Sequence, residues 1–155
     1  MLPNIEAVRL PALAAFARRV YRKNVPHGIQ YGFSSPDRDW FNAEGQIILG
    51  ADRLGLTCSN FVLAIFRAAG FPLVKLETWP LRAEDKEWQA HVIELLNANA
   101  AGERRKLRRL EKVKTEIGVV RCRPVEIGGA ALSDQIPCDF PKALELASQV
   151  ETLLR

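Results

Sequence analysis

The segment from Gly55 to Val74, GLTCSNFVLAIFRAAGFPLV, places the strongest constraint on the fold. It predicts a helix that begins at Thr57 or Cys58 and ends at Gly70. Apolar residues lie on both sides of this helix, with Phe61, Val62, Ile65 and Phe66 on one side and Leu63, Ala64 and Ala68 on the other. A helix that is apolar nearly all round is buried between neighbours. We therefore expect this helix to be the spine of the core.

The other patterns predict a mixture of helices and strands. Apolar residues at helical spacing predict helices over 10–22, 83–98, 104–116 and 142–154. Period-2 patterns and short apolar runs predict strands over 27–33, 46–50 and 117–123, with the first two paired as a hairpin. The segment 125–132 is predicted as a short helix or turn. Together these elements predict an α+β fold, with helices packed on a small antiparallel sheet.

Length and composition narrow the class of protein. A chain of 155 residues fits a single domain, 1–155, and 48% apolar with 26% charged residues is typical of a globular protein. No apolar run approaches the about 20 residues of a membrane-spanning helix, and the N-terminal segment does not have the pattern of a secretory signal. We expect a cytoplasmic protein that is not membrane-spanning.

The three cysteines, Cys58, Cys122 and Cys138, differ in what their positions predict. They have no CxxC spacing, so they predict neither a disulfide framework nor a familiar zinc site, and we expect no metal and no organic cofactor. Only Cys58 stands at the start of a predicted helix. Backbone amides and the dipole at a helix N-terminus favour a thiolate, and the same amides can stabilise an oxyanion. Cys58 is therefore the candidate nucleophile.

The residues around Cys58 resemble a known family. A cysteine followed by Ser59, Phe61 and Val62 in the form C-S-x-F-V opens the nucleophile helix of papain-like NlpC-type cysteine hydrolases, and the Tyr31-Gly32 pair upstream is similar to one that this family often has. The resemblance implies a papain-like fold, in either the usual or the circularly permuted order, and a bacterial hydrolase or acyltransferase that acts on amide or ester bonds. Thr57 stands where the bacterial wall hydrolases commonly have Asp.

A papain-like site needs a histidine that accepts the thiol proton and returns it to the leaving group. His27, at the start of a predicted strand as in the permuted relatives, is the preferred base, and His91, within a predicted helix, is the alternative. Tyr31 is expected to shape the cleft. A third catalytic residue is left unassigned among Asn42, Glu44 and Gln46. The expected substrate is a peptide or a small molecule.

Other interpretations stay open beside the hydrolase. Cys58 can be a buried structural cysteine, and Cys122 and Cys138 fit packing roles. Trp79, Trp88, Glu84 and Asp85 fit the acidic opening turn of a helix with an aromatic residue docked on the core. The segment 104–114 holds seven Lys and Arg against one Glu, so the alternative function is a noncatalytic module of the same fold that binds an acidic partner. Nucleic-acid binding by this segment is less favoured, because it fits an amphipathic helix with a solvated basic face.

Overall fold

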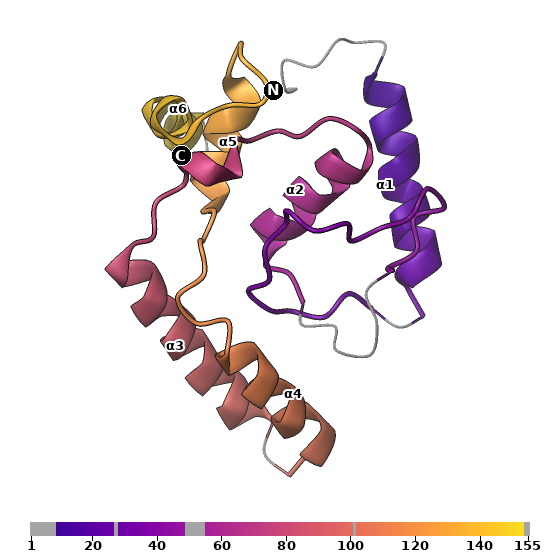
Figure 1. Cartoon of the computed structure of the whole chain (residues 1–155), viewed down its shortest axis with the longest axis vertical. Helices are drawn as coiled ribbons and strands as arrows, with labels where there is room; N and C mark the ends of the chain where they lie inside the picture. The colour runs from indigo at the N-terminus through magenta and orange to yellow at the C-terminus, as the bar shows by residue number, and fades with distance from the viewer. Residues whose placement is uncertain (1–8, 27, 49–54, 101, 154–155) are drawn as a thin grey trace.

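The computed structural model describes residues 9–26, 28–48, 55–100, 102–153 of the chain. Within these ranges the regular elements are six α-helices and one short 3-10 helix (Figure 1). In chain order they are α1 (Leu10–Asn24), α2 (Cys58–Ala68), η1 (Leu76–Thr78), α3 (Ala83–Asn99), α4 (Arg104–Lys114), α5 (Pro124–Leu132) and α6 (Phe140–Leu153). Each helix predicted from the sequence is present with closely similar bounds. None of the described helices is long and apolar enough to cross a bilayer.

The predicted α+β class is wrong, because the described residues form no β-sheet. The described residues 28–33 do not pair with 46–48, and the rest of the predicted hairpin, residues 27, 49 and 50, lies outside the described residues. The backbone of residues 30–34 bonds instead to the chain just before α2, where the amide of Leu56 donates to the Gln30 carbonyl at 3.0 Å and that of Ser34 donates to the Gly55 carbonyl at 3.1 Å. Extended segments are therefore present, but their partners are too short and irregular to build a sheet. A papain-like sheet is excluded on the same ground.

The second hairpin strand has a different partner from the one expected. Ile47 forms an isolated antiparallel bridge with Phe41, and the turn between them is closed by hydrogen bonds between Asn42 and Gln46. Asn24, at the end of α1, donates from its side-chain amide to the carbonyl of Gly45 at 2.8 Å. This small turn consequently packs on α1 rather than extending a sheet.

The predicted strand 117–123 is not formed. Residues 117–119 make turns and a bend after α4, and residues 120–123 have side chains where a neighbouring strand would lie. Gln89 of α3 accepts from the amide of Gly118 and donates to the carbonyl of Val119. Arg82 donates to the carbonyl of Arg121 at 2.9 Å. Because buried backbone polar groups need partners of some kind, these two side chains replace a strand ladder.

Helix α2 lies between two hydrophobic clusters, as predicted for the spine of the core. Leu63 belongs to a cluster that includes Trp79 and residues of α5 and α6, whereas Ile65 belongs to one that includes Trp40 and residues of α1. Phe66 packs against both clusters. The all-round apolar pattern of the sequence thus predicted the position of this helix correctly.

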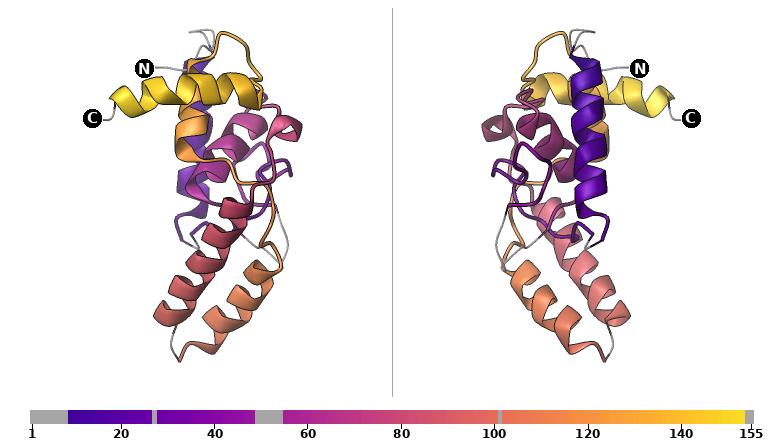
Figure 2. Two further views of the ribbon diagram at one scale, coloured as in Figure 1. Left: turned by 90° about the vertical axis from the view of Figure 1, so that its left-hand side faces the viewer. Right: turned by 90° about the vertical axis from the view of Figure 1, so that its right-hand side faces the viewer.

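Helices α5 and α6 cross at close range. A Cβ atom added at Gly129 would lie 2.1 Å from the carbonyl oxygen of Ala143, which is far below any real contact, so the two backbones touch because this position is glycine. Ala143 and Ala147 on the facing side of α6 are also small and buried. The pair forms a compact unit at one end of the molecule (Figure 2).

Helices α3 and α4 form an antiparallel hairpin at the opposite end, and it extends away from the other helices in all views (Figures 1 and 2). A third cluster holds the hairpin together, with Ile93 of α3 against Leu110 and Val113 of α4. Phe33 is 1% exposed and belongs to the same cluster. It joins the hairpin to the described segment 28–48, which follows α1 in the chain.

Candidate active site at the start of helix α2

Cys58 is the first residue of α2, and its side chain is exposed. Thr57 caps the helix, because its hydroxyl accepts a hydrogen bond from the Asn60 amide at 3.1 Å. The amides of Cys58 and Ser59 precede the first intrahelical bond, so they have no acceptor within the helix. An accessible thiol therefore stands beside two backbone donors, as the sequence predicts.

The start of α2 is anchored through Asn60 to a buried carboxylate. Asn60 is 2% exposed and donates from its side-chain amide to the carbonyl of Ser34 at 2.9 Å. Glu116 in turn accepts hydrogen bonds from the amide of Phe33 at 3.1 Å and from the hydroxyl of Ser34. The chain from Glu116 through Ser34 to Asn60 fixes the helix start relative to the α4 end of the hairpin.

Glu116 has neutral hydrogen-bond partners. Burial raises the pKa of its carboxyl above the ordinary value of 4.5, and the hydrogen bonds from Ser34 and Phe33 together with the charges of Arg38 and Arg109 offset only part of that effect. Protonation of Glu116 therefore requires less acid than protonation of an exposed glutamate.

Tyr31 lies within electrostatic reach of Cys58. Burial, and secondarily the proximity of Cys58, raises the pKa of the Tyr31 phenol above 10.0, while Arg121 has a smaller opposing effect. The phenol consequently keeps its proton at neutral pH. The Tyr31 ring packs edge-on against Phe33 at a centroid distance of 6.1 Å, and its backbone carbonyl accepts a hydrogen bond from Arg109. These contacts place Tyr31 near Cys58, and they do not test its predicted role in a cleft.

Of the two histidines predicted as the base, the structure describes the position of His91 and not that of His27. His27, the preferred base, lies outside the described residues. His91 has a side chain that is 65% exposed and lies 3.7 Å from Glu94 on the same helix. It is two residues away from both Gln89 and Ile93, which are buried, and so it points about 200° around α3 from each of them. His91 therefore lies on the face of α3 opposite to the one that packs on the rest of the chain.

The candidates for a third catalytic residue lie in the turn on α1. Asn42 accepts from the Gln46 amide at 2.8 Å, and their side chains lie 3.4 Å apart. Glu44 is exposed and lies beside the basic side chains of α1. These contacts stabilise the turn, and they assign no catalytic role to any of the three residues.

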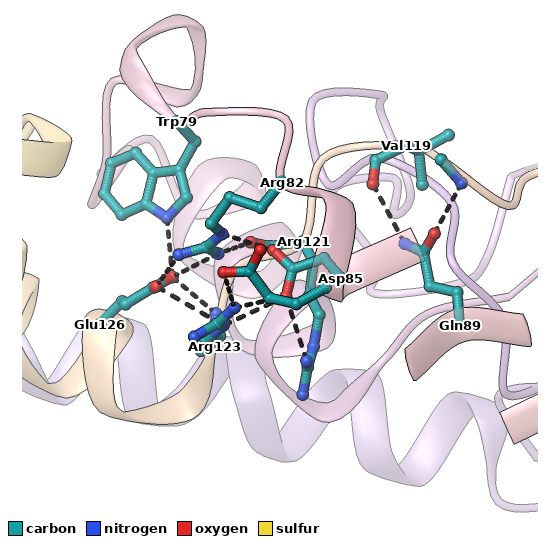
Figure 3. Close-up of polar contacts among 10 residues, drawn as sticks. Trp79, Arg82, Asp85, Gln89, Val119, Arg121, Arg123 and Glu126 are labelled. Atoms are coloured by element: carbon teal, nitrogen blue, oxygen red, sulfur yellow. Dashed lines mark hydrogen bonds and ion pairs between the residues drawn. The ribbon is translucent and has the colours of Figure 1, made fainter. Parts of the chain in front are cut away.

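The largest polar cluster of the described chain was not predicted from the sequence (Figure 3). Asp85 of α3 and Glu126 of α5 are 2% and 1% exposed, and Arg82 binds both carboxylates. Arg121 and Arg123, from the extended segment before α5, bind the other oxygen of Asp85 at 3.2 Å and 2.9 Å. These ion pairs join α3, α5 and the segment before α5 around two buried carboxylates.

Aromatic rings complete this ion-pair cluster. The indole of Trp79 donates to Glu126 at 3.1 Å, and the backbone amide of Arg123 donates to the same carboxylate oxygen at 2.9 Å. The guanidinium of Arg121 lies 3.5 Å from the ring centroid of Trp88. Each carboxylate thus has several donors, which is what a buried charge requires.

Electrostatics within the cluster favour the ionised forms. Burial by itself would raise the pKa of Asp85, but hydrogen bonds from Arg82 and Arg123 outweigh burial and hold the pKa below its ordinary value of 3.8. Burial likewise opposes the charge of Arg82, but its bonds to Glu126 and Asp85 raise the pKa of its guanidinium above its ordinary value. Asp85 and Arg82 stay charged because each binds a group of opposite charge.

The sequence carries a partial signal for this cluster. Arg82 and Asp85 lie three residues apart in WPLRAEDKEW, and Arg121, Arg123 and Glu126 lie at alternate or helical spacing in RCRPVE. The two motifs hold opposite charges next to tryptophan and proline, but nothing in their spacing indicates that they meet. Trp79 docks on the core as predicted, and Asp85 is a buried ion-pair partner as well as an acid in the first turn of α3.

The other two cysteines are buried. Cys122 is 2% exposed, and burial raises the pKa of its thiol to about 12. Cys138 is 1% exposed and donates to the carbonyl of Asp139 at 3.3 Å. Both belong to the cluster that packs against α5 and α6, which confirms their packing roles.

Comparisons of the chain with protein-family models, with curated proteins and with solved structures find no match.

Proposed function

We propose that the protein is a thiol-dependent hydrolase or acyltransferase whose nucleophile is Cys58 and whose substrate is an amide or an ester. The observation that carries the proposal is the exposed thiol at the first position of a capped helix, next to backbone amides that have no acceptor within that helix. The proposal does not rest on a papain-like sheet.

The chemistry begins with attack of the Cys58 sulfur on the substrate carbonyl carbon. The thiol proton passes to a base, and the carbonyl oxygen gains negative charge that the Cys58 amide can stabilise. When the C–N or C–O bond breaks, the protonated base returns its proton to the leaving amine or alcohol, and a thioester remains on Cys58. Attack by water or by an acceptor amine or alcohol then releases the acyl group and the thiol.

Tyr31 is proposed to line the cleft and to bind the substrate. Its phenol is protonated at neutral pH, as an ordinary tyrosine is, and the raised pKa only strengthens this preference, so the hydroxyl can donate a hydrogen bond to a substrate oxygen. His27 is proposed as the base. His91 is the weaker candidate, because it points away from the packed face of α3.

The direct test is hydrolysis of p-nitrophenyl esters and of p-nitroanilide amides by Cys58→Ala. We expect the variant to lose at least about 100-fold in kcat/KM, as expected when an active-site nucleophile is removed. Cys122→Ala is the matched control, since it removes a buried thiol, and it should keep activity. Circular dichroism confirms that both variants fold. Equal rates for wild type and Cys58→Ala would remove the proposal.

The histidines offer a second test. His27→Ala should lose activity on the order of 100-fold through loss of general base catalysis, whereas His91→Ala should change it little. The reverse outcome would assign the base to His91. If neither substitution lowered the rate, no histidine would serve Cys58 and the mechanism above would be incorrect.

Native-state labelling tests the accessibility on which the proposal depends. Iodoacetamide at pH 8 should modify Cys58 and leave Cys122 and Cys138 unmodified until the protein unfolds, because both of those thiols are buried. Peptide mapping by mass spectrometry identifies the labelled residue. Labelling of Cys122 at the same rate as Cys58 would contradict this description of the site.

A further inference from the structure

We propose that the exposed face of α4 is a docking surface for a protein segment rich in aspartate and glutamate. Helix α4 packs on α3 through Leu110 and Val113, and the hairpin that they form extends from the rest of the molecule (Figures 1 and 2). Its other face is therefore open to solvent over most of the helix. This inference is independent of the reaction proposed for Cys58.

Three arginines in the first half of α4 carry the argument. Arg104, Arg105 and Arg108 are exposed, and none of them has an ion-pair partner within the described part of the chain. Arg104 and Arg108 are one helical turn apart on the same face, and Arg105 lies three residues before Arg108. The neighbouring lysines differ, because Lys106 binds Glu103 and Lys114 binds Glu111.

The charge of the first turn opposes the helix dipole. The N-terminal end of a helix carries partial positive charge, and α4 begins with two arginines and a lysine and has no acidic residue in its first turn. Glu103, the residue before the helix, makes no side-chain cap. A carboxylate-rich partner would relieve this repulsion, and Arg offers two parallel donors to each carboxylate.

The charge distribution favours a compact acidic segment over a nucleic acid. Residues 104–114 hold seven Lys and Arg against one Glu, and the remaining chain holds 15 Lys and Arg against 17 Asp and Glu, a formal charge of −2. A long polyanion would extend beyond α4 and be repelled by the net negative charge of the remaining chain. A short acidic segment bound to α4 alone would avoid that repulsion. Helix α4 also has no aromatic residue on which a base could stack, and Leu107, 39% exposed, offers apolar contact instead.

The test is fluorescence anisotropy of a fluorescein-labelled peptide of aspartate and glutamate with one central leucine. The triple variant Arg104→Gln, Arg105→Gln, Arg108→Gln should weaken binding on the order of 10-fold or more. The matched control removes three charges from the exposed side of α1 by Arg18→Gln, Arg22→Gln and Lys23→Gln. It should bind as the wild type does, because only the site of the charge differs.

Further outcomes decide the class of partner. Binding should weaken as salt is raised, and Cys58→Ala should bind with unchanged affinity, which separates this surface from the proposed active site. The proposal is overturned if the α4 and α1 variants lose affinity equally, if the wild type does not bind the peptide at low salt, or if a single-stranded or duplex oligonucleotide of matched charge binds α4 more tightly. Circular dichroism of both triple variants shows whether the helices remain folded.

Discussion

Asp85 and Glu116 are both buried carboxylates, yet their pKa values shift in opposite directions. Asp85 accepts hydrogen bonds from guanidinium groups, which outweigh the effect of burial. Glu116 accepts from a backbone amide and a hydroxyl, and these neutral donors do not outweigh it. The comparison teaches that partner charge, rather than burial alone, decides whether a buried acid stays ionised.

The largest expected effect comes from removing Asp85. Asp85→Ala leaves Arg82 and Arg121 without their shared carboxylate, and we expect the free energy of unfolding to fall by about 3–5 kcal/mol. The matched control is Glu84→Ala, because the Glu84 side chain is 63% exposed and binds Arg123 at the surface. It should cost no more than about 1 kcal/mol. Urea denaturation measures both, and equal losses would refute the role assigned to the buried cluster.

Glu116→Gln should have a smaller effect, and one that depends on pH. From about pH 4.5 up to the raised pKa of Glu116, the folded state holds a proton that the unfolded state has released, so wild-type stability falls as pH rises through this window. The glutamine keeps an acceptor but does not titrate, and the difference in unfolding free energy between variant and wild type should change across the window. A difference that stays constant would show that the pKa is not raised.

For Asp85, the expected change of stability with pH has the opposite sign. Its pKa in the folded state is lowered below 3.8, so its contribution to stability is present above that pH and is lost as pH falls through the lowered value. The stability difference between wild type and Asp85→Asn should therefore shrink only in strong acid. Chemical denaturation between pH 2 and pH 7 measures it, and a loss that begins above pH 5 would contradict the ion-pair geometry.

The smallest effect is expected for Arg121→Lys. Lysine keeps the charge but has no planar guanidinium that could stack on Trp88 while it binds Asp85, and we expect the free energy of unfolding to fall by about 1–2 kcal/mol. Arg67→Lys is the control, since Arg67 is 43% exposed and pairs with Asp37 at the surface. A comparable loss at both positions would show that the stacking adds nothing.

Sequence patterns predicted the helices well, because a helix satisfies its own backbone and its face is set by local spacing. The buried spine at α2 and its start at Cys58 followed from the apolar residues on both of its sides. The basic helix followed from Leu110 and Val113 at helical spacing. These properties depend only on residues close in sequence.

The strand predictions were wrong because strand pairing depends on residues that are distant in the sequence. An alternating segment predicts extended backbone, but its partner is decided by distant residues. Gln89 and Arg82 satisfy the backbone of the segment 117–123, and no local pattern distinguishes such side chains from a neighbouring strand. The hydrogen bond between Ser34 and Glu116 likewise joins residues that are far apart in the sequence. For the candidate site, the position of Cys58 at a helix start was predictable from local sequence, whereas the contacts that hold this helix start in place were not.

The three hydrophobic clusters have a spectroscopic consequence, because each of them contacts one tryptophan. Trp79 is buried in the cluster with α5 and α6, Trp40 is buried in the cluster with α1, and Trp88 packs on the cluster of the hairpin beneath a guanidinium. These are the three tryptophans of the chain. Variants that keep one indole each would report by emission wavelength whether the hairpin melts together with the two clusters around α2 or before them.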